Sequence, residues 1–284
     1  MRTESVTLNL AVKKRSQKRY LENTWWILPL PYLLFIILPI LALFLRLSPV
    51  DFLASLKLEQ VDQALRLSFI TSLSTIILTL IFGTPVAYLL YRRRSRFNRI
   101  IDTLVDLPTV LPPAVAGVAL LMAFGRQGLV GSWLNKMGIS IPFTTVAVII
   151  AQTFIAAPIY IKSAALGFAN VDCELKKAAA LDGASRWQIF RYIMIPMSWM
   201  SLVSGCVLTW ARALGEFGAT IIFAGNFVGR TQTMPLAIYM GFEIDLNVAL
   251  TFSVILVSFS FLVLILVKYF LNNQVDGNNE STND

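Results

Sequence analysis

The chain has 284 residues, of which 56% are hydrophobic and only 14% are charged, and its mean hydropathy is +0.69. Soluble domains carry about 25% charged residues, so this composition predicts an all-α polytopic membrane protein. Cys173 and Cys206 are its two cysteines and it has no histidine, which excludes a disulfide framework and a Cys/His metal site. The net charge of +8 lies in basic runs without interleaved aromatic residues, so we expect contact with membrane lipids and no nucleic-acid partner.

Long windows with few or no charged residues mark the expected membrane spans. A hydrocarbon core of roughly 30 Å takes about 20 helical residues. The windows are Trp26 to Leu45, Leu67 to Tyr91, Leu107 to Gly125, Met137 to Ile161, Tyr192 to Val228 and Leu246 to Val267. The fifth is interrupted only by Arg212 and Glu216, and its length predicts an approach, a span and an extension beyond it. We therefore expect six transmembrane helices within residues 26–271.

Basic residues gather in alternate loops of this arrangement. They precede the first window, follow the second between Arg92 and Arg99, and follow the fourth between Lys162 and Arg191. Lys and Arg in short loops are retained in the cytoplasm during insertion, so both termini are predicted to be cytoplasmic in a cell inner membrane. Residues 1–25 then form a basic extension, and residues 272–284 form a polar tail that we expect to be disordered.

A charged, amphipathic insert, residues 174–196, lies between the fourth and fifth windows. Alanine and lysine favour a helix over residues 174–181, and Gly183 can end it in a left-handed conformation. Ser185 can cap a second short helix, and Pro196 is expected near the start of the next one, where a missing amide donor costs little. A charged insert of this kind in an apolar chain is typical of a docking site for another protein.

The insert resembles the EAA loop of permease subunits of ATP-binding cassette (ABC) importers. Six residues fall at the spacing of that motif: Ala178, Ala179, Gly183, Ile193, Ile195 and Pro196. The resemblance implies a type I ABC importer permease fold, in which this loop sits in a groove of the ATPase subunit and passes its closure to the membrane helices. It assigns the coupling role to Glu174, Lys177, Ala178, Ala179, Gly183, Ala184, Ser185, Trp187, Ile189, Phe190 and Pro196. Lys177 departs from the motif, where the family usually has glutamate, and Glu174 is the expected substitute.

Two further segments narrow the resemblance. Residues 211–220 with 224–239, and residues 107–117, closely resemble the molybdate permease group within the wider molybdate/sulfate permease family. The likeness covers nearly everything from the second window to the sixth. It implies that a tetrahedral oxyanion, molybdate or tungstate, is imported by ATP-driven alternating access, with sulfate or thiosulfate as the alternative cargo.

Arg212 and Glu216 are the charged residues inside the fifth window. They are four residues apart, so on a helix they share a face and can form an ion pair at membrane depth. Two interpretations stay open: the pair supports a gate or a dimer interface along the transport path, or it is a structural tie near the membrane surface. The neighbouring Gly215 and Gly218 favour close helix packing.

Prolines interrupt the third window at positions 108, 112 and 113 and are expected to kink a helix that lines a cavity. Pro112 therefore joins the charged pair as a candidate residue of the translocation path or gate. Thr109 and Thr220 join it as hydroxyl donors that could hydrogen-bond an oxyanion without holding it too tightly.

No phosphate-binding loop of the form G-x-x-x-x-G-K-[ST] occurs in the chain. ATP and magnesium are therefore expected on a partner subunit, and this chain is expected to be neither an enzyme nor a carrier of its own cofactor or metal. The family resemblance implies a homodimer, two ATP-binding subunits on the cytoplasmic side and an extracytoplasmic oxyanion-binding protein. An ion-coupled secondary transporter is a further alternative, although the chain lacks the inverted repeat that such proteins commonly carry.

Overall fold

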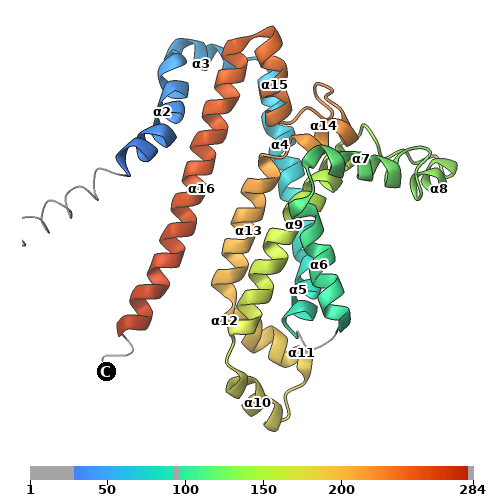
Figure 1. Cartoon of the computed structure of the whole chain (residues 1–284), viewed down its shortest axis with the longest axis vertical. Helices are drawn as coiled ribbons and strands as arrows, with labels where there is room; N and C mark the ends of the chain where they lie inside the picture. Colours follow the sequence, from blue (N-terminus) through green and yellow to red (C-terminus); the bar gives the residue numbers. More distant parts are fainter. Residues whose placement is uncertain (1–28, 93–95, 281–284) are drawn as a thin grey trace, which may run out of the picture. The chain divides into compact units, whose positions relative to one another are not determined.

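The computed structural model describes residues 29–92 and 96–280, and every regular element within those ranges is a helix (Figure 1). The chain divides into two compact units, residues 1–49 and 50–284. The predicted basic extension, the first residues of the first window and residues 281–284 lie outside the described ranges.

In the first unit, α2 (Leu30–Arg46) contains Pro39 and has no buried residue. The next helix, α3 (Pro49–Leu56), begins at the last residue of this unit.

The second unit contains the remaining elements. The first half holds α4 (Glu59–Leu78), η1 (Thr79–Gly83), α5 (Thr84–Tyr91), α6 (Arg96–Val110), α7 (Pro113–Phe124), α8 (Gly131–Lys136) and α9 (Thr145–Asn170). The second half holds α10 (Cys173–Leu181), α11 (Arg186–Ile189), η2 (Phe190–Met194), α12 (Ile195–Met197), α13 (Trp199–Leu214), α14 (Gly218–Ala224), α15 (Met234–Ile244) and α16 (Leu246–Glu280). The two η elements are π-helical turns that continue their neighbouring helices.

Within residues 29–92 and 96–280, three helices are long and apolar enough to cross a membrane alone: Glu59–Tyr91, Thr145–Asn170 and Leu246–Ile265. The predicted count of six is reached only if each of three bent helix pairs forms one span, namely α2 with α3, α6 with α7, and the segment Arg186–Met197 with α13. Each predicted window thus contains apolar helical residues, but three of the six expected spans are bent pairs rather than single helices.

The third window, Leu107 to Gly125, is not one helix. It includes the end of α6 and all of α7, which meet at an angle of 116°. Pro112 and Pro113 have no amide hydrogen to extend the ladder of α6, and a proline disfavours helical geometry in the residue before it. The kink expected from the sequence is present as a sharp turn.

The fourth window, Met137 to Ile161, is shifted along the chain. Its helix, α9, begins at Thr145, where the side chain of Thr144 accepts a hydrogen bond from the amide of Ala147 at 3.3 Å. It then continues past Lys162 to Asn170. The fifth window likewise breaks after Leu214, and α15 follows as a further short helix that the windows do not predict.

The polar tail expected to be disordered from residue 272 is helical as far as Glu280, because α16 continues through it. Extending an existing helix needs no new nucleus, so a polar sequence can follow an apolar one in the same helix.

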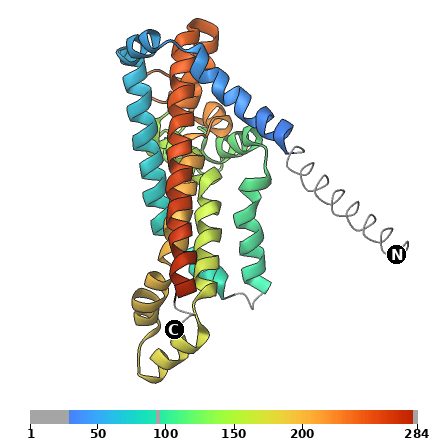
Figure 2. The same ribbon diagram turned by 90° about the vertical axis from the view of Figure 1, so that its left-hand side faces the viewer.

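The core of the second unit is built around α9, which packs against α4, α5, α6, α13 and α14. The helices approach closely at small residues: a Cβ placed on Gly167 would lie 2.6 Å from the Cβ of Ser201 on α13. Small residues allow such backbone contact in membrane proteins, where lipid supplies little hydrophobic drive for helix association. At one end of the unit, α10 and α11 project beyond the ends of α9 and α13 in both views (Figures 1 and 2).

Candidate functional site

The EAA-like loop, residues 174–196, folds locally as its sequence predicts. Asp172 caps α10 by accepting a hydrogen bond from the amide of Glu174 at 2.8 Å. Gly183 then adopts a φ of +87°. The amide of Ala184 donates to the carbonyl of Ala179 at 2.9 Å and that of Gly183 donates to Ala180 at 3.2 Å, the pair of bonds that closes a Schellman motif. The predicted left-handed glycine at the end of the first helix is confirmed.

The second short helix, α11, begins with a capping box. The side chain of Ser185 accepts from the amide of Gln188 at 3.3 Å, and the Gln188 side chain accepts from the amide of Ser185 at 2.7 Å. These reciprocal bonds satisfy two amides at the helix start. The predicted cap at Ser185 is therefore confirmed, and the loop consists of two short helices joined at Gly183.

The outer part of this loop is largely exposed among the described residues, and its contact with the helix bundle is the ammonium of Lys176, 5.5 Å from the ring of Tyr91 on α5. None of the α10 residues is buried, and Leu181 at its end is 88% exposed. Lys177, which stands in place of the motif's glutamate, pairs with Glu174 at 3.4 Å on this open surface. An exposed pair of this kind contributes about 0–1 kcal/mol, so both side chains stay available to a partner.

The inner part of the loop is anchored in the core. Met194 is buried in the same cluster as Phe168 of α9 and Leu90 of α5, and Ile189 and Phe190 pack against that cluster. The Phe190 ring lies 4.9 Å from the ring of Tyr88 and 5.6 Å from that of Phe168, both near edge-to-face. We call Tyr88, Phe168 and Phe190 the aromatic cluster; it joins the loop to α5 and α9.

Pro196 is the second residue of α12, a single turn that continues from η2. The sequence places it near the start of the following helix. In the structure the helical segment starts ten residues earlier, at Arg186, and the bend of 71° comes after Met197, before α13 begins at Trp199. The five residues of η2 form a single π-helical turn inside this helical segment, where backbone amides bond five residues back instead of four.

The predicted ion pair between Arg212 and Glu216 is present. Their side chains meet at 2.8 Å, with Glu216 1% exposed and Arg212 37% exposed. The two do not share one helix, because α13 ends at Leu214. The second carboxylate oxygen of Glu216 instead accepts from the amide of Ala219 at 2.9 Å, so this buried carboxylate ties the end of α13 to the start of α14.

The break between α13 and α14 packs against the break between α6 and α7, and we call this contact the elbow junction. A Cβ on Gly218 would lie 2.6 Å from the Cβ of Pro113, which confirms the predicted close approach at Gly218. Gly215 differs, since only the carbonyl of Ala211, one turn earlier on its own helix, comes within 4 Å of its position. The elbow junction thus places Gly218, two residues after Glu216, against the proline turn.

The other path candidates have different environments. Thr220 is fully buried and its hydroxyl has no hydrogen-bond partner in the described part of the chain. Thr109 is exposed and donates to the carbonyl of Asp106 at 2.7 Å, and Pro112 is exposed at the turn.

Sequence reasoning misses a charged cluster at the interface of α6 and α9. The ammonium of Lys162 lies 2.5 Å from Asp102 and 2.8 Å from Asp106. We call these three residues the ion triad. Asp102 and Asp106 lie one helical turn apart on the same face of α6. This spacing is the sequence signal from which a partner cation could have been expected.

Four hydroxyl side chains of α4 form a buried row. Ser68, Thr71, Ser72 and Thr75 are all fully buried, and Thr75 donates to the side chain of Gln152 on α9 at 3.2 Å. Ser72 accepts from the indole of Trp210 on α13 at 2.9 Å. These hydroxyls therefore tie α4 to its neighbouring helices, which is how polar groups strengthen packing inside a membrane protein.

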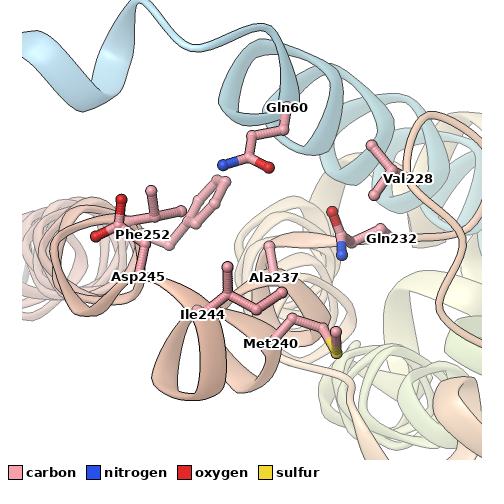
Figure 3. Close-up of a pocket in the computed structure, with 10 residues that line it drawn as sticks. Gln60, Val228, Gln232, Ala237, Met240, Ile244, Asp245 and Phe252 are labelled. Atoms are coloured by element: carbon pink, nitrogen blue, oxygen red, sulfur yellow. The ribbon is translucent and has the colours of Figure 1, made fainter.

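A small cavity of about 90 Å³ lies between α4, α15 and α16, at the end of the unit opposite the EAA-like loop (Figures 1 and 3). Figure 3 shows the amides of Gln60 and Gln232 beside it, among apolar side chains, while the Asp245 carboxylate points away and accepts a hydrogen bond from the amide of Asn247 at 2.9 Å. Among the described residues, no group of three or more His, Cys, Asp or Glu side chains is placed to hold a metal ion.

Comparison with known proteins places this geometry in a family. A family profile described as "Binding-protein-dependent transport system inner membrane component" matches residues 79–276. A probable transport system permease protein, NifC of Clostridium pasteurianum, is 41% identical over 238 residues, covering 84% of this chain and 83% of the relative. The molybdenum transport system permease protein ModB of Mycobacterium tuberculosis is 38% identical over 242 residues, covering 85% and 92%.

A solved structure agrees on the fold. The crystal structure of a bacterial ABC transporter involved in the import of the acidic polysaccharide alginate aligns with a TM-score of 0.64 at 16% identity, covering 92% of this chain and 97% of that one. This supports the predicted type I ABC importer permease fold. With a family profile over most of its length, the chain belongs to the inner-membrane components of binding-protein-dependent transport systems and is a permease subunit of an ABC importer.

Proposed function

We propose that this chain is the membrane half of a molybdate-type importer, in which the EAA-like loop converts closure of partner ATPase subunits into movement of the membrane helices. The observation that carries this proposal is the two-sided construction of the loop. Its outer helix, α10, has no buried residue, whereas Phe190 packs into the aromatic cluster with α5 and α9. A push on the outer side therefore has a packed route to the membrane helices, because well-packed side chains transmit displacement rather than absorb it.

The proposed assembly contains two copies of this chain, two ATP-binding subunits and an extracytoplasmic binding protein. The ATPase subunits would lie at the end of the unit that carries α10, with ATP and magnesium held on them. This end is then cytoplasmic, as are both termini. The basic residues that flank the loop support this orientation through the retention of Lys and Arg on the cytoplasmic side.

The proposed gate is the elbow junction. Two breaks in the chain meet there: the turn of 116° between α6 and α7, and the end of α13, which Glu216 ties to the start of α14. Non-helical backbone at membrane depth is tolerated where it is buried in protein or lines a cavity, which favours a place along the path. Thr109, Pro112 and Thr220 lie on the elements that meet at this contact.

Molybdate is the proposed cargo because a relative covered over 92% of its length is named for molybdenum transport. Sulfate is the second candidate, since both anions are tetrahedral dianions. The membrane-spanning part must bind its cargo weakly enough to release it, so it need not distinguish between the two. The choice between them would then be made mostly by the binding protein.

The test is uptake into proteoliposomes that contain the complete transporter and its binding protein. We expect ATP-dependent uptake of molybdate that tungstate inhibits and that excess sulfate leaves unchanged. Uptake that sulfate inhibits equally would favour the second candidate. Uptake that continues without ATP would contradict the assignment to ABC transport altogether.

A further inference from the structure

A groove of about 620 Å³ lies between α5 and α11, and none of the elements described so far fills it. One wall is formed by η1 and α5, with Leu80, Ile81 and Pro85 as apolar lining residues. The other is formed by Trp187 and Phe190, at the point where the EAA-like loop enters the helix bundle.

The wall on η1 and α5 is a single helix face. Leu80, Thr84, Tyr88 and Arg92 follow each other at intervals of four residues, so their side chains are stacked along one side. The helix buries its other side against α9 through Ala87 and Leu90. Thr84 and Tyr88 lie at the edge of that buried side, where they contact Tyr160 and Phe168 of α9, whereas Ile81 on the groove wall is 58% exposed.

Two arginines, Arg92 and Arg186, give the groove its charge. Both are exposed, no acidic residue lines the groove, and neither arginine forms a salt bridge with any described residue. An apolar wall that ends in two guanidinium groups complements a molecule with hydrocarbon chains and an anionic head.

We propose that this groove binds an anionic phospholipid, with its acyl chains against Leu80, Ile81 and Pro85 and its phosphate at Arg92 and Arg186. Guanidinium groups bind phosphate oxygens through paired hydrogen bonds, which an ammonium or an amide cannot reproduce. Trp187 lies at the boundary between the two parts, the position that tryptophan favours at membrane interfaces. The proposal does not depend on which anion the transporter carries.

A lipid in this place would contact the EAA-like loop directly. It would hold α11 against α5 and so favour one position of the loop, because a ligand shifts an equilibrium toward the state it binds better. The lipid composition of the membrane would thereby tune the coupling between ATPase and transport.

The experiment measures quenching of Trp187 fluorescence by phospholipids brominated near the carboxyl end of their chains, in nanodiscs that hold the complete transporter. The Trp187→Phe variant supplies the signal of all other tryptophans, and the difference from wild type isolates Trp187. We expect brominated phosphatidylglycerol to quench Trp187 at lower mole fraction than brominated phosphatidylcholine does. Each arginine should contribute a preference of roughly fivefold.

The matched variants are Arg92→Gln and Arg96→Gln. Arg92→Gln should lose about fivefold of the preference, Arg92→Lys should keep part of it, and Arg96→Gln, which removes an equal charge outside the groove, should keep all of it. Equal quenching by both lipids would overturn the proposal in favour of ordinary annular lipid. Absence of quenching would overturn it as well, because the groove would then be covered by protein, either an ATPase subunit or the second copy of this chain.

Discussion

Gly183 is required for its backbone conformation rather than for lack of space. Its φ is +87°, and a Cβ built on it would meet no atom within 4 Å. A left-handed conformation costs an L residue about 1–2 kcal/mol, and a β-branched residue adopts it least readily, whereas asparagine tolerates it. A substitution at this position is therefore expected to act through the strain of the left-handed backbone and not through a clash with a neighbouring atom.

We expect Gly183→Val to lower the amount of anion imported per ATP hydrolysed, because the strained turn would release α10 from its fixed angle to α11. Gly183→Asn should retain most of the wild-type ratio. The measurement is simultaneous uptake and phosphate release in proteoliposomes. If the valine variant couples as well as the asparagine variant, the backbone conformation is not what the loop requires.

Arg212 and Glu216 form a tie in which one partner is almost completely buried. Removing the arginine leaves a carboxylate with 1% exposure without its cation, and an uncompensated buried group costs roughly 1–3 kcal/mol or more. We expect Arg212→Met to lower the thermal unfolding midpoint of the purified transporter clearly. Lys177→Met breaks an exposed pair and serves as the control, with an expected change within about 0.5 kcal/mol. Equal shifts in the two variants would contradict the role of Glu216 as the tie between α13 and α14.

At the scale of helices, the ion triad decides how α6 meets α9. Lys162 neutralises one carboxylate and shares its charge with the second, which allows α9 to carry a lysine beyond the predicted end of its span. Asp102 and Asp106 would otherwise be like charges one turn apart, which destabilise a helix and repel any shared neighbour. The triad thus fixes α6, which leads into the elbow junction, to α9, which leads into the EAA-like loop.

This arrangement predicts an asymmetry between two variants. Lys162→Met leaves two carboxylates facing an apolar helix and should reduce both stability and uptake. Asp106→Asn keeps one ion pair between Lys162 and Asp102 and should have a small effect on both. Thermal unfolding and uptake of the two variants in parallel give the comparison, and a larger loss in Asp106→Asn would show that the triad does not act as a clamp.

Sequence alone was enough for features that depend on neighbouring residues. The turn at Gly183 and the cap at Ser185 follow from residues within a few positions, and the structure has both. Lys162 lies 60 and 56 residues from its partners, so the local spacing of Asp102 and Asp106 can suggest a cation between them but cannot say which residue supplies it. The contact of Phe190 with Tyr88 is equally non-local.

Helix bounds show the same division. Apolar windows locate the membrane-spanning segments because hydropathy is summed over many residues. They do not locate the start of α9, which depends on a single cap at Thr144, or the turn of 116° between α6 and α7, where two adjacent prolines stop a helix inside an apolar stretch. Mean hydropathy detects neither the helix start nor the turn, because one cap residue or two prolines change the average over a window very little.

For the molecule as a whole, the account depends on one mechanical connection. The fold provides an outer helix, α10, that is open to a partner, and an inner anchor at Phe190 that lies in contact with α5 and α9. ATP hydrolysis on another subunit can move the membrane helices only if these two ends of the loop move together. Loss of the anchor should therefore uncouple ATP hydrolysis from transport, while the ATPase subunits still bind to the loop.

The most direct test is the ratio of molybdate imported to ATP hydrolysed in proteoliposomes carrying the complete transporter, compared between Phe190→Ala and Tyr192→Ala. Tyr192 lies two residues away and is exposed, so its variant controls for loss of an aromatic ring from the same segment. We predict that the ratio falls severalfold or more in Phe190→Ala while ATP hydrolysis continues, and that Tyr192→Ala keeps the wild-type ratio. An unchanged ratio in Phe190→Ala, in a variant that still assembles with its ATPase subunits, would contradict the account.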